Sequence, residues 1–455
     1  MPTAYTILFL LLILVAAATW IIPAGSYDYV DGVPVAGTYH TVEQNPQGVG
    51  DVLKAAFSGF YDAVDVCIFI LMVGGFLGVV MKTGAVDAGV SNIIRLLGGR
   101  EKWLIPILML LFGLGGTTYG MWEETMAFYP LLIPVFLAAG YDAVVGISVI
   151  LLGAGAGVIA STVNPFATGI AAGFAGVSLG EGIVLRLLEW VAFEAAAIWF
   201  VMAYAAKVKK NPSKSVVGVG AGKIQVSMDQ QVPFTAKRKV IMALFTLTFL
   251  IMVYAVVPFD EMGLPLPTLG WWFPELSALF LVAGVVIGLI DRMSEEELVE
   301  IYVAGCADLL GVAFIIGISR GITVLMNDGS ITDTVLHWGE QALSGAGAIS
   351  FTLLVFALYL PLTILIPSSS GLATLSIPIV APLGKFAGVG GDLVVTAFQS
   401  ASGLVNIITP TAAVLMGALA LGHVPYDRWV KYVWKLMLWF LLLALAFLVA
   451  GVLLG

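Results

Sequence analysis

Residues 161–169 read Ser-Thr-Val-Asn-Pro-Phe-Ala-Thr-Gly and interrupt an apolar segment that runs from Ala143 to Val177. Pro165 lacks the backbone N–H of other residues, and its ring obstructs the preceding helical turn. Carbonyl groups are therefore freed before the break, while the half-helix after it presents unpaired N–H groups and a positive dipole end. Freed carbonyls and hydroxyls suit a hard cation such as sodium, and a half-helix N-terminus suits a carboxylate. The pattern predicts a broken helix that binds small charged ligands.

A second break reads Ser-Gly-Leu-Val-Asn-Ile-Ile-Thr-Pro-Thr over residues 402–411. Its Thr409-Pro410 pair follows Asn164-Pro165 at a spacing of 245 residues. Further residue pairs share this spacing, with one slip to 244: Phe69 with Phe314, Met81 with Met326, Gly84 with Gly329 and, at the slip, Ile133-Pro134 with Ile377-Pro378. One offset maintained along the chain in this way indicates an internal repeat.

The composition places the chain in a lipid bilayer. Its 455 residues are 60% hydrophobic and 11% charged, whereas about 25% of a soluble domain is charged. The mean hydropathy is +1.04. A net charge of −9 leaves no basic surface for nucleic acid. Cys67 and Cys306 lie in apolar segments and the three histidines are far apart, so neither a disulfide framework nor a metal centre is expected.

Nine apolar segments reach the length of about 20 residues that a helix needs to cross a membrane. They are Ala4–Pro23, Asp62–Lys82, Ala143–Val177, Ile183–Ala206, Val240–Val257, Glu275–Asp291, Tyr302–Leu325, Asp392–Leu421 and Val433–Leu454. Two further stretches, Trp103–Ala139 and Ser350–Leu383, are split by polar residues into limbs of about 14 to 16 residues, too short to cross. Both are predicted to be re-entrant hairpins. The predicted fold class is therefore an all-α polytopic membrane protein.

Lysine and arginine concentrate in cytoplasmic loops and so orient the chain. With the N-terminus inside and the C-terminus outside, 16 of the 20 basic residues are cytoplasmic: Lys82, Arg95, Arg100, Lys102, Lys207, Lys209, Lys210, Lys214, Lys223, Lys237, Arg238, Lys239, Arg292, Arg428, Lys431 and Lys435. Most tryptophans lie near predicted span ends and are expected to anchor at the interface: Trp103, Trp190, Trp271, Trp272, Trp429, Trp434 and Trp439.

Under this topology the two copies enter the membrane from opposite sides, which makes them inverted-topology repeats. The predicted division is residues 1–206 for the first repeat, 207–274 for a basic cytoplasmic loop with a linking span, and 275–455 for the second repeat. Secondary transporters use such repeats and place substrate and coupling-ion sites at discontinuous helices near the bilayer midplane.

The two hairpin tips complete the predicted site. The first tip, residues 115–125, reads Gly-Gly-Thr-Thr-Tyr-Gly-Met-Trp-Glu-Glu-Thr, and the second tip, residues 365–371, reads Leu-Ile-Pro-Ser-Ser-Ser-Gly. The candidate substrate-binding residues are Thr117, Thr118, Glu123, Glu124, Thr125, Asn164, Pro165, Thr168, Ser368, Ser369, Ser370, Asn406, Thr409, Pro410 and Thr411. The candidate coupling-ion residues are Ser161, Thr162, Asn164, Glu124, Ser369, Ser402 and Asn406.

Charged residues at apolar depth are functional candidates. Glu123 or Glu124 could coordinate a cation, carry a coupled proton or pair with a cationic substrate; the structural alternative is a bond to neighbouring backbone amides. Arg320 lies near a predicted helix end, where it either snorkels to the interface or meets a substrate carboxylate or gate acid. Interfacial or structural pairing is expected for the remaining acids: Asp62, Asp65, Asp308, Glu189 and Glu194.

Several motifs resemble one known family over essentially the whole chain. They are the opening Met1-Pro2-Thr3-Ala4-Tyr5-Thr6, the exit Pro23-Ala24-Gly25, the tip Gly120-Met121-Trp122-Glu123-Glu124-Thr125 and the break at 161–169. The chain resembles the YfcC-like branch of the DcuC-type (C4-dicarboxylate anaerobic carrier) family in the ion transporter superfamily. The resemblance implies a dimer with scaffold and transport domains and an elevator-like motion. It also implies a substrate that is a C4-dicarboxylate or a basic amino acid.

This sequence departs from the Ser-Asn-Thr motifs that sodium/dicarboxylate members of the superfamily carry at both tips. Glu123-Glu124-Thr125 stands at the first tip and Ser368-Ser369-Ser370 at the second. The resemblance therefore leaves the substrate and the coupling ion open.

The predicted function is secondary active transport of a small carboxylate or amino acid across the cytoplasmic (inner) membrane, coupled to sodium or protons. One alternative is a basic amino acid (arginine/ornithine) exchanger, because two adjacent carboxylates at the first tip repel a dianion. A different class, the ion channel, would use the same breaks. An enzyme and a cofactor are not expected, and the lack of a P-loop pattern argues against a self-contained ATP-driven pump. The expected partners are a small-molecule substrate, the bilayer and a second copy.

Overall fold

A computed structural model describes residues 4–454 apart from 31–32, 87, 90–91, 93–99, 179, 219–232, 257–258 and 260–264. Two residues of the predicted cytoplasmic set, Arg95 and Lys223, lie outside the described residues, as does the side chain of Pro165.

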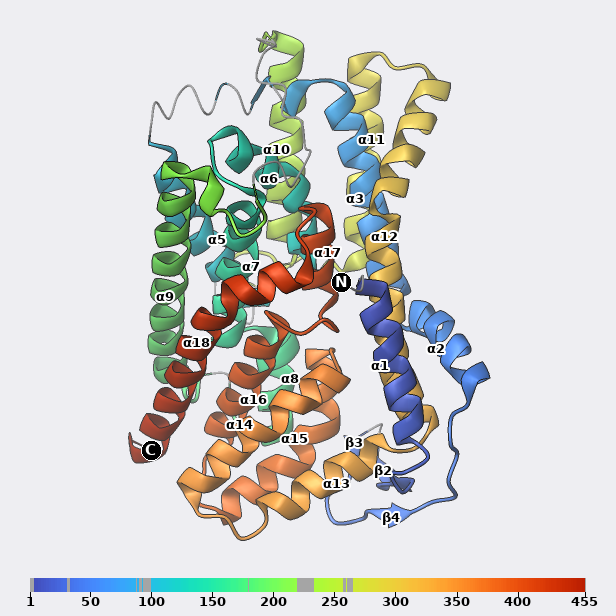
Figure 1. Ribbon diagram of the computed structural model, residues 1–455, viewed down its shortest axis with the longest axis vertical. Coiled ribbons are helices and arrows are strands. Elements are labelled where there is room, and N and C mark those ends of the chain that lie inside the picture. The colour runs from blue at the N-terminus through green and yellow to red at the C-terminus, as the bar shows by residue number, and fades with distance from the viewer. Residues whose placement is uncertain are drawn as a thin grey trace.

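Helices account for most of the described chain (Figure 1). They are α1 (Ala4–Ala18), α2 (Val49–Asp62), α3 (Val64–Lys82), α5 (Leu104–Tyr119), α6 (Tyr129–Ala138), α7 (Ala143–Ile159), α8 (Ile170–Ala175), α9 (Ile183–Lys210), α10 (Ala236–Val256), α11 (Phe273–Asp291), α12 (Glu295–Asp328), α13 (Thr332–Leu343), α14 (Ala348–Leu365), α15 (Ser369–Phe386), α16 (Gly391–Asn406), α17 (Ala413–Leu421) and α18 (Tyr426–Leu454). Five of them are long and apolar enough to cross a membrane: α3, α11, α12, α14 and α18. The prediction of a helical, multi-pass membrane protein is confirmed.

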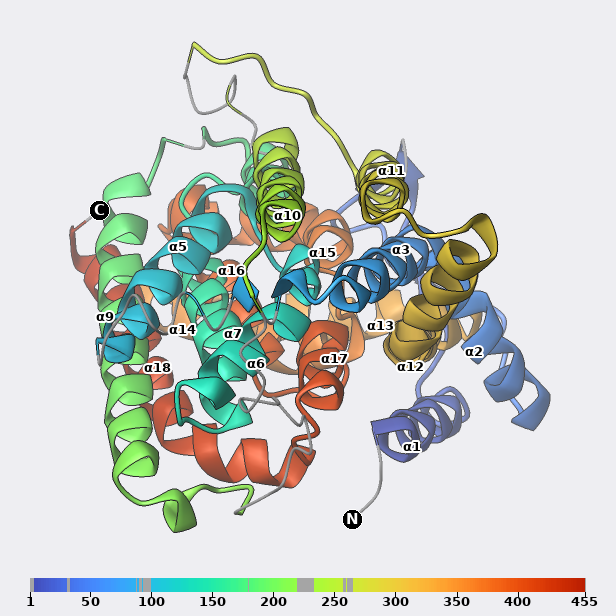
Figure 2. The same ribbon diagram turned by 90° about the horizontal axis from the view of Figure 1, so that it is seen from above.

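Two groups of helices are separated in the view from above (Figure 2). One group holds α1, α2, α3, α11 and α12, and the other holds α5, α6, α7 and α9 together with α14 to α18. Within the first group α3 and α12 are antiparallel, since Gly74 meets Gly305 while Cys67 donates to the carbonyl of Ala313. The glycines bring the two backbones close together, as small residues do between membrane helices.

Both breaks and both polar tips occur where the sequence places them. The first break separates α7 from α8 and contains a π-helical turn, Pro165–Gly169. The second break separates α16 from α17. The first tip joins α5 to α6 through a 3-10 turn, Glu123–Ala127, and the second tip joins α14 to α15.

The predicted limb length is wrong for the second hairpin. Its helices α14 and α15 have 18 residues each. Pro361 lies inside α14, and Pro378 and Pro382 lie inside α15, without ending either helix. Prolines are tolerated in this way where neighbouring groups satisfy the freed carbonyls.

Three predicted span boundaries also shift. The helix predicted over Tyr302–Leu325 begins at Glu295, because the Ser294 hydroxyl accepts a hydrogen bond from the Glu297 N–H (3.2 Å) and caps it. The last helix begins at Tyr426 rather than Val433. The first described helix ends at Ala18, before the predicted Pro23.

A small cap absent from the sequence-based prediction covers one end of the molecule. Strand β1 (Gly25–Ser26) pairs with β4 (His40–Thr41), and β2 (Tyr29–Val30) pairs with β3 (Val33–Pro34), both antiparallel. Two tyrosines fasten this segment to α13: Tyr27 donates to Glu340 (2.8 Å) and Tyr29 donates to Asp333 (2.7 Å). Burial, followed by the Glu340 carboxylate, raises the pKa of the Tyr27 phenol, so the tyrosine stays a neutral donor.

Candidate functional site

A small cavity of about 40 Å³ lies between the two helix groups. It is lined by residues of the first tip, the second tip, the second break and the helices α3 and α12: Val66, Ile70, Trp122, Glu123, Met126, Ile316, Ser319, Arg320, Pro367, Asn406, Thr411, Ala412, Ala413 and Val414. Three of the four predicted polar interruptions therefore meet at one point. The first break does not line this cavity.

The two adjacent tip acids have different surroundings. The Glu124 side chain is buried, and its Oε2 accepts a hydrogen bond from the Trp122 N–H (3.1 Å). It thus occupies the backbone-bonding position that the structural alternative describes. Glu123 lines the small cavity, as does Arg320 of α12. Arg320 also lies 3.7 Å from Asp62 at the end of α2. The cavity therefore holds one acid and one base supplied by different helix groups.

The second break supplies uncharged polar groups to the same cavity. The Asn406 side chain is 7% exposed, and its Oδ1 makes no hydrogen bond within the described chain. Thr411 is held by its neighbours, since its Oγ1 lies 2.9 Å from Thr409 Oγ1 and its carbonyl accepts a bond from Ser319 Oγ. The first N–H groups of α17, from Ala413 onward, have no partner within that helix and lie at the cavity wall. These groups suit a carboxylate.

The carbonyls freed at the second break are taken by α18. The Trp429 indole N–H donates to the Ile407 carbonyl (3.0 Å), and the Tyr426 hydroxyl donates to the Ile408 carbonyl (2.6 Å). The expectation that Trp429 anchors at the interface is wrong, because this side chain is fully buried. The physical reason is the proline-containing break itself, which leaves carbonyls that need buried donors.

The first break is bonded to the first tip instead. Thr117 Oγ1 donates to the Ala160 carbonyl (2.8 Å), and the Thr162 N–H donates to the Thr117 carbonyl (2.9 Å). Thr168 donates to Ser161 (2.7 Å). The Thr162 hydroxyl donates to the Thr117 carbonyl as well (2.9 Å). Most of the predicted coupling-ion hydroxyls of this region are thus engaged within the chain.

The remaining predicted residues lie at the margins of the two tips. Ser368 caps α15 by accepting from the Gly371 N–H (3.2 Å), and Ser369 and Ser370 follow it in the first turn, partly exposed. The Thr118 hydroxyl donates back to the Leu114 carbonyl (2.6 Å). Thr125 donates to the Trp122 carbonyl (2.5 Å), and Ser402 is buried within α16. None of these six lines the small cavity.

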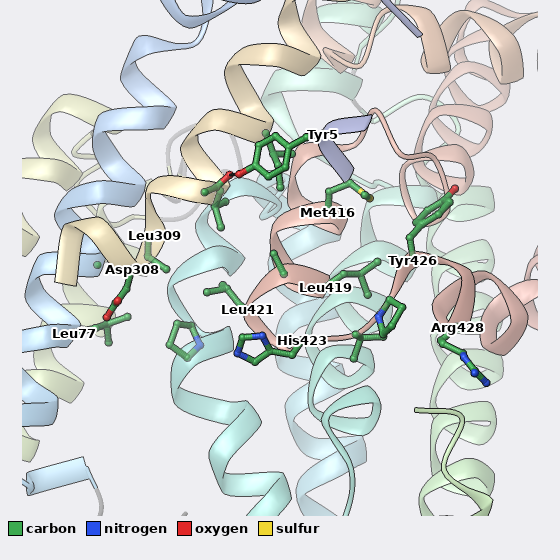
Figure 3. A pocket seen from close by; sticks show the side chains of 18 of the residues that line it. Tyr5, Leu77, Asp308, Leu309, Met416, Leu419, Leu421, His423, Tyr426 and Arg428 are labelled. Carbon is green, nitrogen blue, oxygen red and sulfur yellow. Dashed lines mark hydrogen bonds between the residues drawn. The ribbon is translucent and has the colours of Figure 1, made fainter. Parts of the chain in front are cut away.

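Helices α12 and α17 line both the small cavity and a second, much larger cavity of about 1380 Å³ (Figure 3). We call the contact between these two helices the seam. Along α12, Asp308 to Ile315 line the large cavity and Ile316 to Arg320 line the small one. At α17, residues between Met416 and Leu421 line the large cavity, and Ala412 to Val414 line the small one. His423 lies in the loop after α17, and Arg428 lies in the first turn of α18 (Figure 3). The small cavity therefore continues the large one along the seam, a feature the sequence did not indicate.

No group of three or more His, Cys, Asp or Glu side chains in the described part of the chain is arranged to hold a metal ion. The polar groups of the small cavity are suited to binding a small charged molecule. They do not include a nucleophile paired with a base.

Comparisons with known proteins agree with a transport role. The C4-dicarboxylate anaerobic carrier (DcuC) family matches residues 1–453. An uncharacterized protein of Haemophilus influenzae is 35% identical over 99% of this chain and 97% of its own length. A protein of Escherichia coli K12, provisionally named basic amino acid antiporter YfcC, is 31% identical over 95% of this chain and 92% of its own length.

Two solved transporter structures are similar at lower levels. The YdaH transporter of Alcanivorax borkumensis has a TM-score of 0.46 and 14% identity, covering 98% of both chains. MtrF of Neisseria gonorrhoeae, from a class of antimetabolite efflux pumps, has a TM-score of 0.43 and 18% identity, covering 98% of this chain and 94% of its own. Both scores are too low to carry those folds over to this chain. The family match over the whole length is decisive: the chain belongs to the C4-dicarboxylate anaerobic carrier (DcuC) family of membrane transporters and is not an enzyme.

Proposed function

We propose that the chain is a secondary active transporter whose substrate, a small carboxylate or amino acid, binds at the small cavity. The observation that carries this proposal is the set of groups gathered there. Glu123 from the first tip, Arg320 from α12 and the N-terminus of α17 all line one space. An acid meets a cation, while a guanidinium and unpaired backbone N–H groups meet a carboxylate.

An amino acid fits these groups better than a dicarboxylate does. Its carboxylate would meet Arg320 and the N-terminus of α17, and its ammonium or a basic side chain would meet Glu123. A dianion would place its second carboxylate near Glu123, and like charges in a desolvated site repel. The provisional name of the Escherichia coli relative, a basic amino acid antiporter, supports the same substrate class. A C4-dicarboxylate, after which the family is named, is the second candidate.

The positions of the two cavities support an alternating-access mechanism. At about 40 Å³ the small cavity holds roughly one water molecule, so a substrate enters only when the tips move away from α3 and α12. The large cavity supplies the approach along the same seam. We propose that the group containing α5 to α9 and α14 to α18 moves against the group containing α3 and α12 in an elevator-like step. A channel would instead need a continuous polar path through this seam.

The remaining parts of the proposal concern the membrane and the assembly. The chain sits in the cytoplasmic (inner) membrane with its N-terminus inside, is built from two inverted-topology repeats with re-entrant hairpins, and forms a homodimer. Sodium or protons drive uptake or exchange. Arg428 and Lys431 line the large cavity, which supports a cytoplasmic position for it under the positive-inside rule.

Uptake into proteoliposomes tests the proposal. Purified protein is reconstituted, and labelled arginine, ornithine, glutamate and succinate are offered under imposed sodium or proton gradients and under exchange conditions. Accumulation or exchange of one of them, saturable and blocked by excess unlabelled compound, is expected. Flux that never exceeds equilibrium and shows no exchange would indicate a channel. No protein-dependent flux of any of the four would remove this substrate class.

A further inference from the structure

Helix α9 carries three charged residues that face the interior of the protein. Arg186, Glu189 and Glu194 are 1%, 0% and 2% exposed. Charged side chains are rarely buried to this extent unless they are paired. None of the three lines either cavity.

Glu189 and Arg186 have polar surroundings. Ser400 of α16 donates to Glu189 Oε1 (2.8 Å). The Arg186 guanidinium donates to the Glu181 carbonyl (2.9 Å) and lies within the electrostatic range of Glu189 and Asp392. Glu189 is therefore paired through one oxygen, whereas its Oε2 makes no hydrogen bond within the described chain.

Glu194 has no such partner. Both of its carboxylate oxygens are buried, and neither makes a hydrogen bond within the described chain. The carboxylate packs directly on Gly113 of α5, where a side-chain carbon would overlap it. The structural pairing expected for Glu194 is therefore wrong, because the neighbouring helix offers only a glycine backbone.

The elements packed on α9 bring no compensating charge to Glu194. Helices α5 and α7 contain no acidic or basic residue. The described titratable groups on or beside the surrounding elements are Asp142 before α7; Arg186, Glu189, Tyr204, Lys207, Lys209 and Lys210 on α9; Asp392 on α16; and Tyr426, Asp427, Arg428, Lys431, Tyr432 and Lys435 on α18. None of them bonds to Glu194.

An ionised carboxylate in this position would be uncompensated, and burying such a charge costs far more than neutralising it. The apolar surroundings therefore favour the neutral, protonated form of Glu194. A buried acid with no structural partner is a functional candidate within a membrane protein.

We propose that Glu194 is the binding site for the coupling proton of the transport cycle. The proposal rests on the proposed transport function and specifies its driving ion. Hydronium on one side of the membrane gives up a proton, an O–H bond forms on the Glu194 carboxylate, and water is left. On the other side the O–H bond breaks and water accepts the proton. Glu189, which accepts a hydrogen bond from Ser400, does not take part in this step.

Infrared difference spectroscopy on the full-length protein tests proton binding without any substrate. A pH titration of wild-type protein should show the carbonyl band of a buried carboxylic acid that disappears at high pH. Glu194→Gln should remove the component of this band that Glu194 contributes, and the matched variant Glu189→Gln should retain that component. A band that persists unchanged in Glu194→Gln overturns the proposal, whether or not any substrate is transported.

Proteoliposome uptake of labelled arginine, or of whichever compound the function assay identifies, tests the coupling. Glu194→Gln should lose accumulation driven by a proton gradient while keeping exchange of internal for external substrate. Glu194→Asp, which keeps a titratable group, should restore proton-driven accumulation with a shifted pH profile. Accumulation driven by a sodium gradient alone in wild type, or proton-driven accumulation by Glu194→Gln, overturns the proposal and leaves the transport function standing.

Discussion

The two breaks share a sequence pattern and a spacing but have different neighbours. The first break is bonded to the first tip through Thr117 and Thr162, and Asn164 packs on Gly120. The second break is held by two α18 side chains and presents Asn406 to the small cavity. The difference teaches that a repeated motif fixes where a helix opens, while the packing around it determines whether the opened groups remain available to a ligand.

The largest effect is expected at the tip acids. Glu123→Gln should abolish uptake, because it removes the only acid that lines the small cavity in the described chain. Glu124→Gln is the matched control and should keep most uptake, since a glutamine oxygen can still accept the Trp122 N–H. Initial uptake rates in proteoliposomes measure both. Equal loss in the two variants would show that the acids act together.

A single added methyl group tests the packing between the first break and the first tip, where Asn164 lies against Gly120. Gly120 has φ +78°, and a side-chain carbon there would lie 2.5 Å from the Asn164 amide nitrogen. Gly120→Ala should therefore lower stability by more than the roughly 1 to 2 kcal/mol that left-handed strain alone costs. Gly140→Ala, with φ +82° and no atom within 4 Å, measures the strain alone. The unfolding temperatures of the two variants are compared in detergent. Equal shifts would show that packing of Asn164 on Gly120 adds nothing to stability.

The α18 support of the second break is tested at Trp429. Trp429→Phe removes the donor to the Ile407 carbonyl and leaves that buried oxygen unpaired, which should cost about 1 to 3 kcal/mol. Trp434→Phe, on the exposed side of the same helix, should change stability by about 0.5 kcal/mol or less. The unfolding temperatures of the two variants are compared in one detergent. Similar losses would mean that indole size, not the hydrogen bond, matters.

The smallest effect on stability is expected at Asn406. Its buried oxygen has no partner in the described chain, so Asn406→Ala should leave the unfolding temperature nearly unchanged while raising the KM for uptake. Asn164→Ala should do the opposite, because Asn164 Oδ1 accepts from the Ala167 N–H (3.3 Å) at the first break. If Asn406→Ala leaves the KM unchanged, Asn406 does not contact the substrate.

The sequence alone determined the membrane class, the positions of both breaks and both tips, and the family resemblance, because these depend on apolar length, proline chemistry and short motifs. The sequence predicted interfacial anchoring for Trp429 and pairing for Glu194, and both predictions are wrong. The surroundings of these two side chains depend on which helix lies opposite them. Only the tertiary structure separated Glu123 from Glu124 and brought the first tip and the second break to one cavity. The physical reason is that a hydrogen-bond donor or a charge acts over a few ångströms, and which groups come that close is decided by packing between segments hundreds of residues apart.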